Sequence, residues 1–282
     1  MKLNWQFIRE VGTVRWIWRT VLRQTSKRIL RKDNSITLPT GLRMTLPRSS
    51  KFASEVFITR CNVDWGSEAL FARHLDTKGV VLDVGANIGY YSVYVLPLVF
   101  AVHAFEPDPT AGEILRKNLR ACHLSAHVHQ VAVSNWHGET QFVVERDSEI
   151  SHLAEPTDES DTNRRSVEVT TIDHFVAERE LSITGIKIDV EGADFQVLQG
   201  SMDTLQRHSP LVLAETSAED RLFHLLQPLQ YRVFAFVKQA NHRGFHFQEI
   251  IAGFNLRSKM LFLVPPRLHP SFQALASTGM EP

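Results

Sequence analysis

Cysteine is scarce in this sequence, and no apolar run is long enough to cross a bilayer. The 282 residues include two cysteines, Cys61 and Cys122, which excludes a disulfide-rich scaffold and a zinc site built on paired cysteines. The longest apolar run, from Val93 to Val102, is interrupted by Pro97, whereas a membrane-spanning helix needs about 20 apolar residues. The basic N-terminus lacks the unbroken apolar core of a secretory signal. We therefore expect a reduced, cytoplasmic protein.

The sequence also lacks net charge, but its charges are unevenly distributed. The formal charge is zero, yet residues 1–32 hold nine Lys/Arg and a single acid. Within residues 3–31, apolar side chains recur at three- and four-residue steps beside an arginine stripe, a pattern that predicts a basic amphipathic helix. Two interpretations stay open for this helix: peripheral contact with an anionic inner membrane surface, or packing on the domain or on a second subunit of a homodimer.

Nucleic acid is not an expected partner. Outside residues 1–32 the chain carries 22 basic and 30 acidic residues, and no recognised nucleic-acid-binding module is present. The body of the protein therefore has the wrong charge to follow a phosphate backbone.

Strand-like and helix-like segments alternate along most of the chain. After a small hairpin, strands are predicted at 80–84, 101–105, 127–133, 185–190, 211–215 and 231–237, with helices between them. Apolar strands that alternate with helices indicate a parallel sheet covered on both faces. A polar stretch interrupts the alternation and predicts an inserted hairpin at about 138–176. We expect three parts: 1–50 with the helix and hairpin, the main domain at 51–265, and a loose tail at 266–282.

A glycine-containing motif follows the first strand of this alternation. The stretch VVLDVGANIGYYS places Asp83 two residues before Gly85, and Gly89 four residues after it. In a βα unit the end of the strand and the start of the helix form a ligand crevice, and glycines let the ligand approach the backbone closely. The G-x-G-x-x-G fingerprint of dinucleotide folds would need glycines at Asn87 and Tyr90, so a dehydrogenase is disfavoured.

The motif instead fits a ligand with a cationic amine and no pyrophosphate, such as S-adenosylmethionine. Asp83 is predicted to face the methionyl ammonium group, directly or through water. A second acid at the end of the next strand, Glu106 in VHAFEP, is expected to hold the ribose hydroxyls. The adenine is expected after the third strand. The predicted cofactor-binding residues are Asp83, Gly85, Ala86, Asn87, Gly89, Glu106, Pro107, Ala132, Val133 and Asn135.

These motifs make the sequence resemble the FkbM family of S-adenosylmethionine-dependent methyltransferases. The matching blocks are VVLDVGANIGYYS, AFEPDP followed by LRKNL, VAVSNWHG, VEVTTIDHF, GIKIDVEGADFQVLQG and PLVLAET. KIDVEGAD is the most diagnostic of them, although family members more often have Glu in place of Asp194. The resemblance implies an α/β fold: a Rossmann-like, seven-stranded class I methyltransferase sheet with an inserted β-hairpin and an N-terminal helical extension. It also implies O-methylation of hydroxyls on macrolides or sugars.

Acidic residues at two strand ends are the main catalytic candidates. Methyl transfer requires an acceptor oxygen placed in line with the sulfonium and stripped of its proton. Strand alternation puts Lys187, Asp189 and Glu191 on one face, so Lys187 is expected to pair with one of the two acids. The carboxylates then either cap the next helix and hold Lys187, or include a general base. Asp189, Glu191 and, on the polar hairpin tip, His152 are the predicted catalytic residues.

A magnesium ion is a further expectation. Methyltransferases similar to catechol O-methyltransferase hold Mg²⁺ with acids at the ends of these two strands, which correspond here to Asp189 and Glu215. The sequence supplies no clear third ligand.

Three classes of function remain open on the sequence. The first is an O-methyltransferase acting on a hydroxyl of a sugar, a glycan or another small secondary metabolite. The second is a methyltransferase acting at nitrogen or carbon, because the cofactor motif says nothing about the acceptor. The third is a non-catalytic S-adenosylmethionine-binding protein of the same fold, which the intact motif disfavours.

Overall fold

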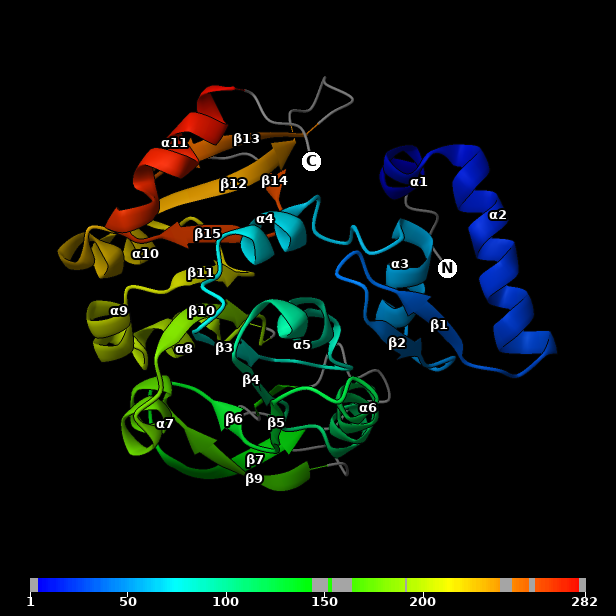
Figure 1. Ribbon diagram of the computed structural model, residues 1–282, viewed down its shortest axis with the longest axis horizontal. Coiled ribbons are helices and arrows are strands. Elements are labelled where there is room, and N and C mark those ends of the chain that lie inside the picture. The colour runs from blue at the N-terminus through cyan, green and yellow to red at the C-terminus, as the bar shows by residue number, and fades with distance from the viewer. Residues whose placement is uncertain are drawn as a thin grey trace.

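A large central sheet organises the molecule (Figure 1). The computed structural model describes residues 5–143, 152–153, 164–190, 192–238, 245–253 and 257–278. Within these ranges nine strands join in the order β13-β12-β15-β11-β10-β3-β4-β5, with β14 beside β12. Their bounds are β3 (Val80–Val84), β4 (Ala101–Phe105), β5 (Ala126–His129), β10 (Ile183–Ile188), β11 (Leu211–Ala214), β12 (Arg232–Lys238), β13 (Phe245–Ile250), β14 (Arg257–Ser258) and β15 (Leu261–Val264).

The strand order places a ligand crevice at the middle of the sheet. Strands β5, β4, β3, β10 and β11 pair in parallel, and β15 enters antiparallel between β11 and β12. The chain runs outward from β3 through β4 to β5, then returns to β10 on the other side of β3. The carboxyl ends of β3 and β10 therefore form a topological switch point, where open α/β sheets bind ligands. The sheet exceeds the seven predicted strands because β13 and β14 extend it at the β12 edge.

Helices cover both faces of the sheet. Alternation along β3 sends Val81 into one core and Val80, Leu82 and Val84 into the other, as expected for a strand buried on both sides. The first core is closed by α3 (Phe52–Thr59), α4 (Ser67–Arg73), α5 (Tyr90–Val95), α6 (Pro109–Arg120) and α11 (His269–Ser277). The second is closed by α7 (Ile172–Arg179), α8 (Asp194–Gln199), α9 (Met202–His208) and α10 (Asp220–Leu226).

The interruption predicted at 138–176 forms a second sheet. Strand β7 (Gly138–Val143) pairs antiparallel with β9 (Arg164–Thr170), and β6 (Ala132–Val133) and β8 (His152–Leu153) complete it in the order β6-β9-β7-β8. Two boundaries differ from the prediction. The expected strand 127–133 divides between the two sheets, and the residues after β9 form α7, which begins beyond the Thr171 cap.

The N-terminal segment forms two helices in place of the single predicted one. Gly12, at φ 88°, separates α1 (Trp5–Val11) from α2 (Thr13–Gln24), and the π-turn η1 (Thr25–Ile29) follows. The small hairpin is confirmed as β1 (Asn34–Thr37) and β2 (Arg43–Leu46). Among the described helices, none has the length and apolarity that a membrane crossing requires.

The part of the tail that the structure describes, residues 266–278, is largely helical and not loose as predicted for 266–282. After a 3₁₀ turn at Pro266–Leu268, residues His269–Ser277 form α11, which lies along β12 and β13 in Figure 1. Phe272 is fully buried and contacts the rings of Phe234, Phe247 and Phe262. Leu275 and Ala276, one turn further on, are partly buried against the same core.

Replacing the anchor of α11 tests this packing. We expect Phe272→Ala to lower the free energy of unfolding by about 3–5 kcal/mol, because it removes a fully buried ring and leaves a cavity among three others. Urea denaturation provides the measurement, with Gln273→Ala on the exposed side of the same helix as the matched control. A cost below about 1 kcal/mol, typical of a surface substitution, would show that α11 is weakly attached.

Candidate active site

A cavity of about 420 Å³ opens at the carboxyl ends of β3 and β10. One side of it is formed by the glycine motif, by the start of the loop after β4, and by β6. The other side is formed by α3, the 63–64 segment, and residues 257–260 around β14. A pocket of this size, lined by both apolar side chains and convergent charged and polar groups, has the properties of a site for a polar small molecule.

The glycine motif brings the backbone of β3 unusually close to β10. Gly85 has φ 74°, and a Cβ atom at this position would lie 1.7 Å from the Asp189 carbonyl oxygen. The amide groups of Gly85 and Ala86 both donate to the Phe105 carbonyl at 3.0 Å. Only glycine fits this conformation and this approach. The motif therefore forms a thin, backbone-lined wall of the cavity.

Glu106 is held beside this wall by backbone amides. Its carboxylate accepts hydrogen bonds from Asn87 N at 2.7 Å and from Asp108 N at 2.9 Å. Burial raises the pKa of Glu106 to about 7, although the two amide bonds favour the ionised form. Each carboxylate oxygen can accept more than one hydrogen bond, so Glu106 is still able to bind hydroxyl groups from the cavity.

Lys187 lines the cavity and joins the two central strands. Its Nζ donates to the Gly85 carbonyl at 2.9 Å and lies 3.2 Å from Asp189 Oδ2 and 3.6 Å from Asp83 Oδ1. Burial alone would lower the pKa of Lys187, but the carboxylates of Asp189 and Asp83 outweigh it and raise this pKa. The pairing of Lys187 with Asp189 is as predicted. The second partner is Asp83, which also accepts from Ser92 Oγ.

Asp189 and Glu215 lie side by side where β10 and β11 end. The Asp189 amide donates to the Val84 carbonyl and the Glu215 amide to the Ile188 carbonyl, both at 3.0 Å, so the two acids follow equivalent strand ends. Their carboxyl groups lie close enough to interact directly. Desolvation in the cavity, reinforced by the negative charge of Asp189, raises the pKa of Glu215 to about 8. This pair can take up a proton near neutral pH.

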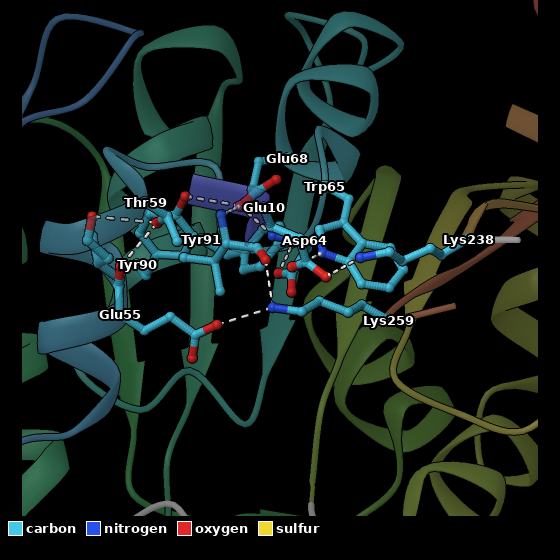
Figure 2. A network of polar contacts seen from close by, with 12 residues as sticks. Glu10, Glu55, Thr59, Asp64, Trp65, Glu68, Tyr90, Tyr91, Lys238 and Lys259 are labelled. Atoms are coloured by element: carbon cyan, nitrogen blue, oxygen red, sulfur yellow. Dashed lines mark hydrogen bonds and ion pairs between the residues drawn. The ribbon is translucent and has the colours of Figure 1, made fainter. Parts of the chain in front are cut away.

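The far wall of the cavity carries charges from the N-terminal half and from β14 (Figure 2). Lys259 Nζ lies 2.9 Å from Glu55 Oε1 and donates to the Val63 carbonyl at 2.6 Å. Asp64 accepts from Tyr91 Oη at 2.7 Å, and burial raises its pKa to about 6. These groups line the same cavity as Gly85 and Glu106 and offer both donors and acceptors to a polar ligand.

Glu68 holds the 63–64 segment of this far wall in place. Its carboxylate accepts from Val63 N at 2.6 Å, Asp64 N at 2.9 Å and Tyr90 Oη at 3.0 Å. Burial and the Asp64 charge raise the pKa of Glu68 to about 7. Because Tyr90 begins α5 directly after the glycine motif, Glu68 connects the far wall to the element that forms the near wall (Figure 2).

Most of the predicted cofactor residues lie together, and three do not reach the cavity. The ones that line it are Gly85, Ala86, Asn87, Glu106, Pro107, Ala132 and Val133. Asp83 is buried behind Lys187, Gly89 caps α5 against Leu115, and the Asn135 side chain donates to Gln199. A direct contact of Asp83 with a ligand ammonium group is therefore not what this geometry favours.

The predicted catalytic residues have mixed placements. Asp189 lines the cavity, and its side chain is 34% exposed. Glu191 lies outside the described residues. His152 belongs to β8, but its side chain is also outside the described part of the structure.

The predicted magnesium site does not fit the donors that are described. Asp189 and Glu215 are adjacent, but Asp189 already pairs with the buried ammonium group of Lys187 at 3.2 Å, which would repel a cation. Across the described ranges, no three His, Cys, Asp or Glu side chains are grouped to hold a metal ion. Magnesium prefers six oxygen ligands in octahedral geometry. The donors that the structure describes therefore do not fit a magnesium ion.

Sequence reasoning missed the whole far wall. Its residues are Phe52, Glu55, Val63, Asp64, Tyr91, Arg257, Ser258, Lys259 and Met260. They come from segments about 200 residues apart in the chain, and only Tyr91, next to the glycine motif, gave a local signal.

The fold and the site define a class of protein: an α/β enzyme with a ligand crevice at its switch point. The family model described as the methyltransferase FkbM domain matches residues 83–247. This is more than half of the chain, and the chain belongs to the FkbM family of methyltransferases. Among curated proteins, none matches the sequence significantly.

Several solved structures are similar to this chain at low identity. Methyltransferase FkbM from Methylobacillus flagellatus KT is 16% identical over 74% of this chain, with a TM-score of 0.45. An rRNA methylase from Streptococcus thermophilus is 13% identical over 71% of this chain and 93% of its own, with a TM-score of 0.41. The chain spans 52% of the M. flagellatus protein. Likeness at this level assigns neither substrate nor partner.

The buried ion pair of Lys187 and Asp83 gives a stability prediction. We expect Lys187→Met to lower the free energy of unfolding by about 3–5 kcal/mol, because it leaves Asp83 buried without its cation. Adding Asp83→Asn to this variant should recover part of the loss. Lys117→Met is the matched control, since the Lys117–Glu113 pair is about two-thirds exposed on both sides and its loss should cost at most about 1 kcal/mol. Equal costs for Lys187 and Lys117 in chemical denaturation would contradict the buried pair.

Proposed function

We propose that this chain transfers the methyl group of S-adenosylmethionine to a hydroxyl oxygen of a sugar, a glycan or another small secondary metabolite. The observation that carries the proposal is the continuity of one cavity. It runs from Gly85 and Glu106 to the carboxyl pair of Asp189 and Glu215. A cofactor held at one end and an acceptor held at the other would meet above Asp189.

The near wall supplies groups suited to each part of the cofactor. Glu106 would accept hydrogen bonds from the ribose hydroxyls, with its orientation fixed by two backbone amides. Ala132 and Val133, both buried at the cavity edge, would pack on the adenine ring. Gly85 allows the methionyl part to lie against the backbone. When bound, the cofactor supplies a sulfonium-linked methyl group with a good leaving group already in place.

The acid pair would remove the acceptor's proton. As the acceptor oxygen forms its bond to the methyl carbon, the sulfur–methyl bond breaks, and the hydroxyl proton passes to the carboxylate of Glu215. Glu215 suits this role because desolvation and Asp189 raise its pKa to about 8. Lys187 holds the Asp189 carboxylate in place. The far-wall groups Asp64, Tyr91 and Lys259 would orient the acceptor.

The cofactor half is tested by calorimetric titration with S-adenosylhomocysteine. We expect the wild type to bind it and Glu106→Gln to lose about tenfold or more in affinity, as expected for a hydrogen bond to a charged group. The amide also places a donor opposite the amides of Asn87 and Asp108. Glu113→Gln, an exposed acid on α6, is the control. No binding by the wild type, or equal binding by Glu106→Gln, would overturn this cofactor site.

The proton-transfer step is tested by the pH dependence of turnover. Methyl incorporation into a panel of glycosides and polyols, assayed with excess EDTA, identifies an acceptor. Because Glu215 must be ionised to act as a base, kcat/KM should rise with pH through about 8 and then level off. In Glu215→Gln we expect a loss of about 10²–10⁴-fold and no break near this pH. A profile unchanged by the substitution would exclude Glu215, and methylation only at amine or carbon acceptors would exclude the proposed O-methylation.

A further inference from the structure

Helix α2 is attached to the protein by its polar face. Arg23 is fully buried, and its guanidinium donates to Asn34 Oδ1 at 2.7 Å, the Leu46 carbonyl at 3.1 Å and the Pro47 carbonyl at 2.6 Å. One turn earlier, Arg19 donates to the Ile58 carbonyl at 2.6 Å. A soluble protein normally docks a surface helix by its apolar stripe. The arginine stripe performs that task here.

The apolar stripe of α2 consequently faces outward. Its members, spaced at three and four residues, share one side of the helix. They are Val14, Ile17, Trp18, Val21 and Leu22, with exposed fractions of 81%, 51%, 64%, 53% and 37%. Ile29 and Leu30, just beyond, are 75% and 56% exposed. We call these seven residues the α2 apolar face. In Figure 1 the helix lies at the outer edge of the molecule, with α3 on its inner side.

This concentration of exposed apolar side chains is not found elsewhere on the described surface. The remaining large apolar residues with high exposure are separated in the chain: Phe100, Leu124, Trp136 and Ile251. Scattered exposure is ordinary, whereas a contiguous apolar patch marks an interaction site. We therefore infer that the α2 apolar face binds a partner.

Exposed positive charges border the α2 apolar face and indicate what that occupant is. Arg15 lies beside the stripe, and Arg28, Arg31 and Lys32 flank its C-terminal end, all exposed. An isologous contact between two copies would set this patch, with its positive border, against an identical one. An anionic bilayer attracts the border and accepts the apolar side chains, including Trp18, which is typical of the membrane interface.

We propose that the α2 apolar face docks on the surface of a membrane rich in anionic phospholipids. The helix lies flat on the bilayer, with the Arg19–Arg23 side holding the enzyme behind it. The apolar side chains enter the acyl boundary and the basic side chains contact lipid phosphates. This surface does not depend on which acceptor the catalytic cavity binds.

Vesicle sedimentation with the full chain tests the proposal. Vesicles of phosphatidylcholine alone are compared with vesicles containing about one-third phosphatidylglycerol, which supplies the anionic surface potential. We expect at least about tenfold stronger partitioning to the anionic vesicles, weakened as salt screens the charges. Ile17→Asp/Val21→Asp should abolish binding by placing two charges in the α2 apolar face. Arg28→Gln/Arg31→Gln should weaken binding about tenfold without removing it.

Phe100→Asp is the matched control. Phe100 is 69% exposed but lies outside the α2 apolar face, so this variant should partition as the wild type does. All substituted residues are exposed. Circular dichroism of each variant would check that it is folded. Absence of wild-type binding to anionic vesicles, or equal binding by Ile17→Asp/Val21→Asp, would overturn the proposal. A wild-type dimer in light scattering that this variant converts to a monomer, with no vesicle binding, would assign the face to a second copy.

Discussion

The ion pair between Lys187 and the two acids at the switch point is the interaction on which the rest of the site depends. A lysine with 4% side-chain exposure between Asp83 and Asp189 is tolerable only because both carboxylates and the Gly85 carbonyl surround it. The same contacts fix the ends of β3 and β10 relative to each other. The glycine wall and the acid pair therefore share one support, and neither can shift without exposing a buried charge.

This support lies at strand ends, and the sequence can indicate which residues come together there. Asp83, Gly85 and Glu106 stand at strand ends, and the position of a strand end follows from local apolar patterning. The parallel order of the strands then brings these ends to one edge of the sheet. Lys187 could be expected to pair because a charged residue in an apolar strand needs a partner. That Asp83 is one such partner depends on the register of β10 against β3, which local pattern does not give.

The residues of the far wall could not be predicted, because their positions do not follow from local apolar patterning. Lys259, which follows β14, donates to the carbonyl of Val63, 196 residues earlier in the chain, and so lies near Asp64. Neither segment has a periodic pattern, and each charge reads as an ordinary surface residue in isolation. The residue that organises this wall is Glu68, whose carboxylate accepts hydrogen bonds from two loop amides and from Tyr90. The residues of such a network are not regularly spaced in the sequence, so no sequence pattern indicates it.

The N-terminal helix shows how a correct pattern can leave its orientation open. The apolar and arginine stripes at residues 3–31 predict amphipathicity, and amphipathicity alone suggests that the apolar side is buried. The structure reverses this because Leu46 of β2, Pro47 and Ile58 of α3 offer backbone carbonyl oxygens to Arg19 and Arg23. The five donors of a guanidinium group can bind several such oxygens at once, which an apolar side chain cannot do. Because Arg19 and Arg23 bind the domain, the apolar side chains on the opposite side of the helix face outward.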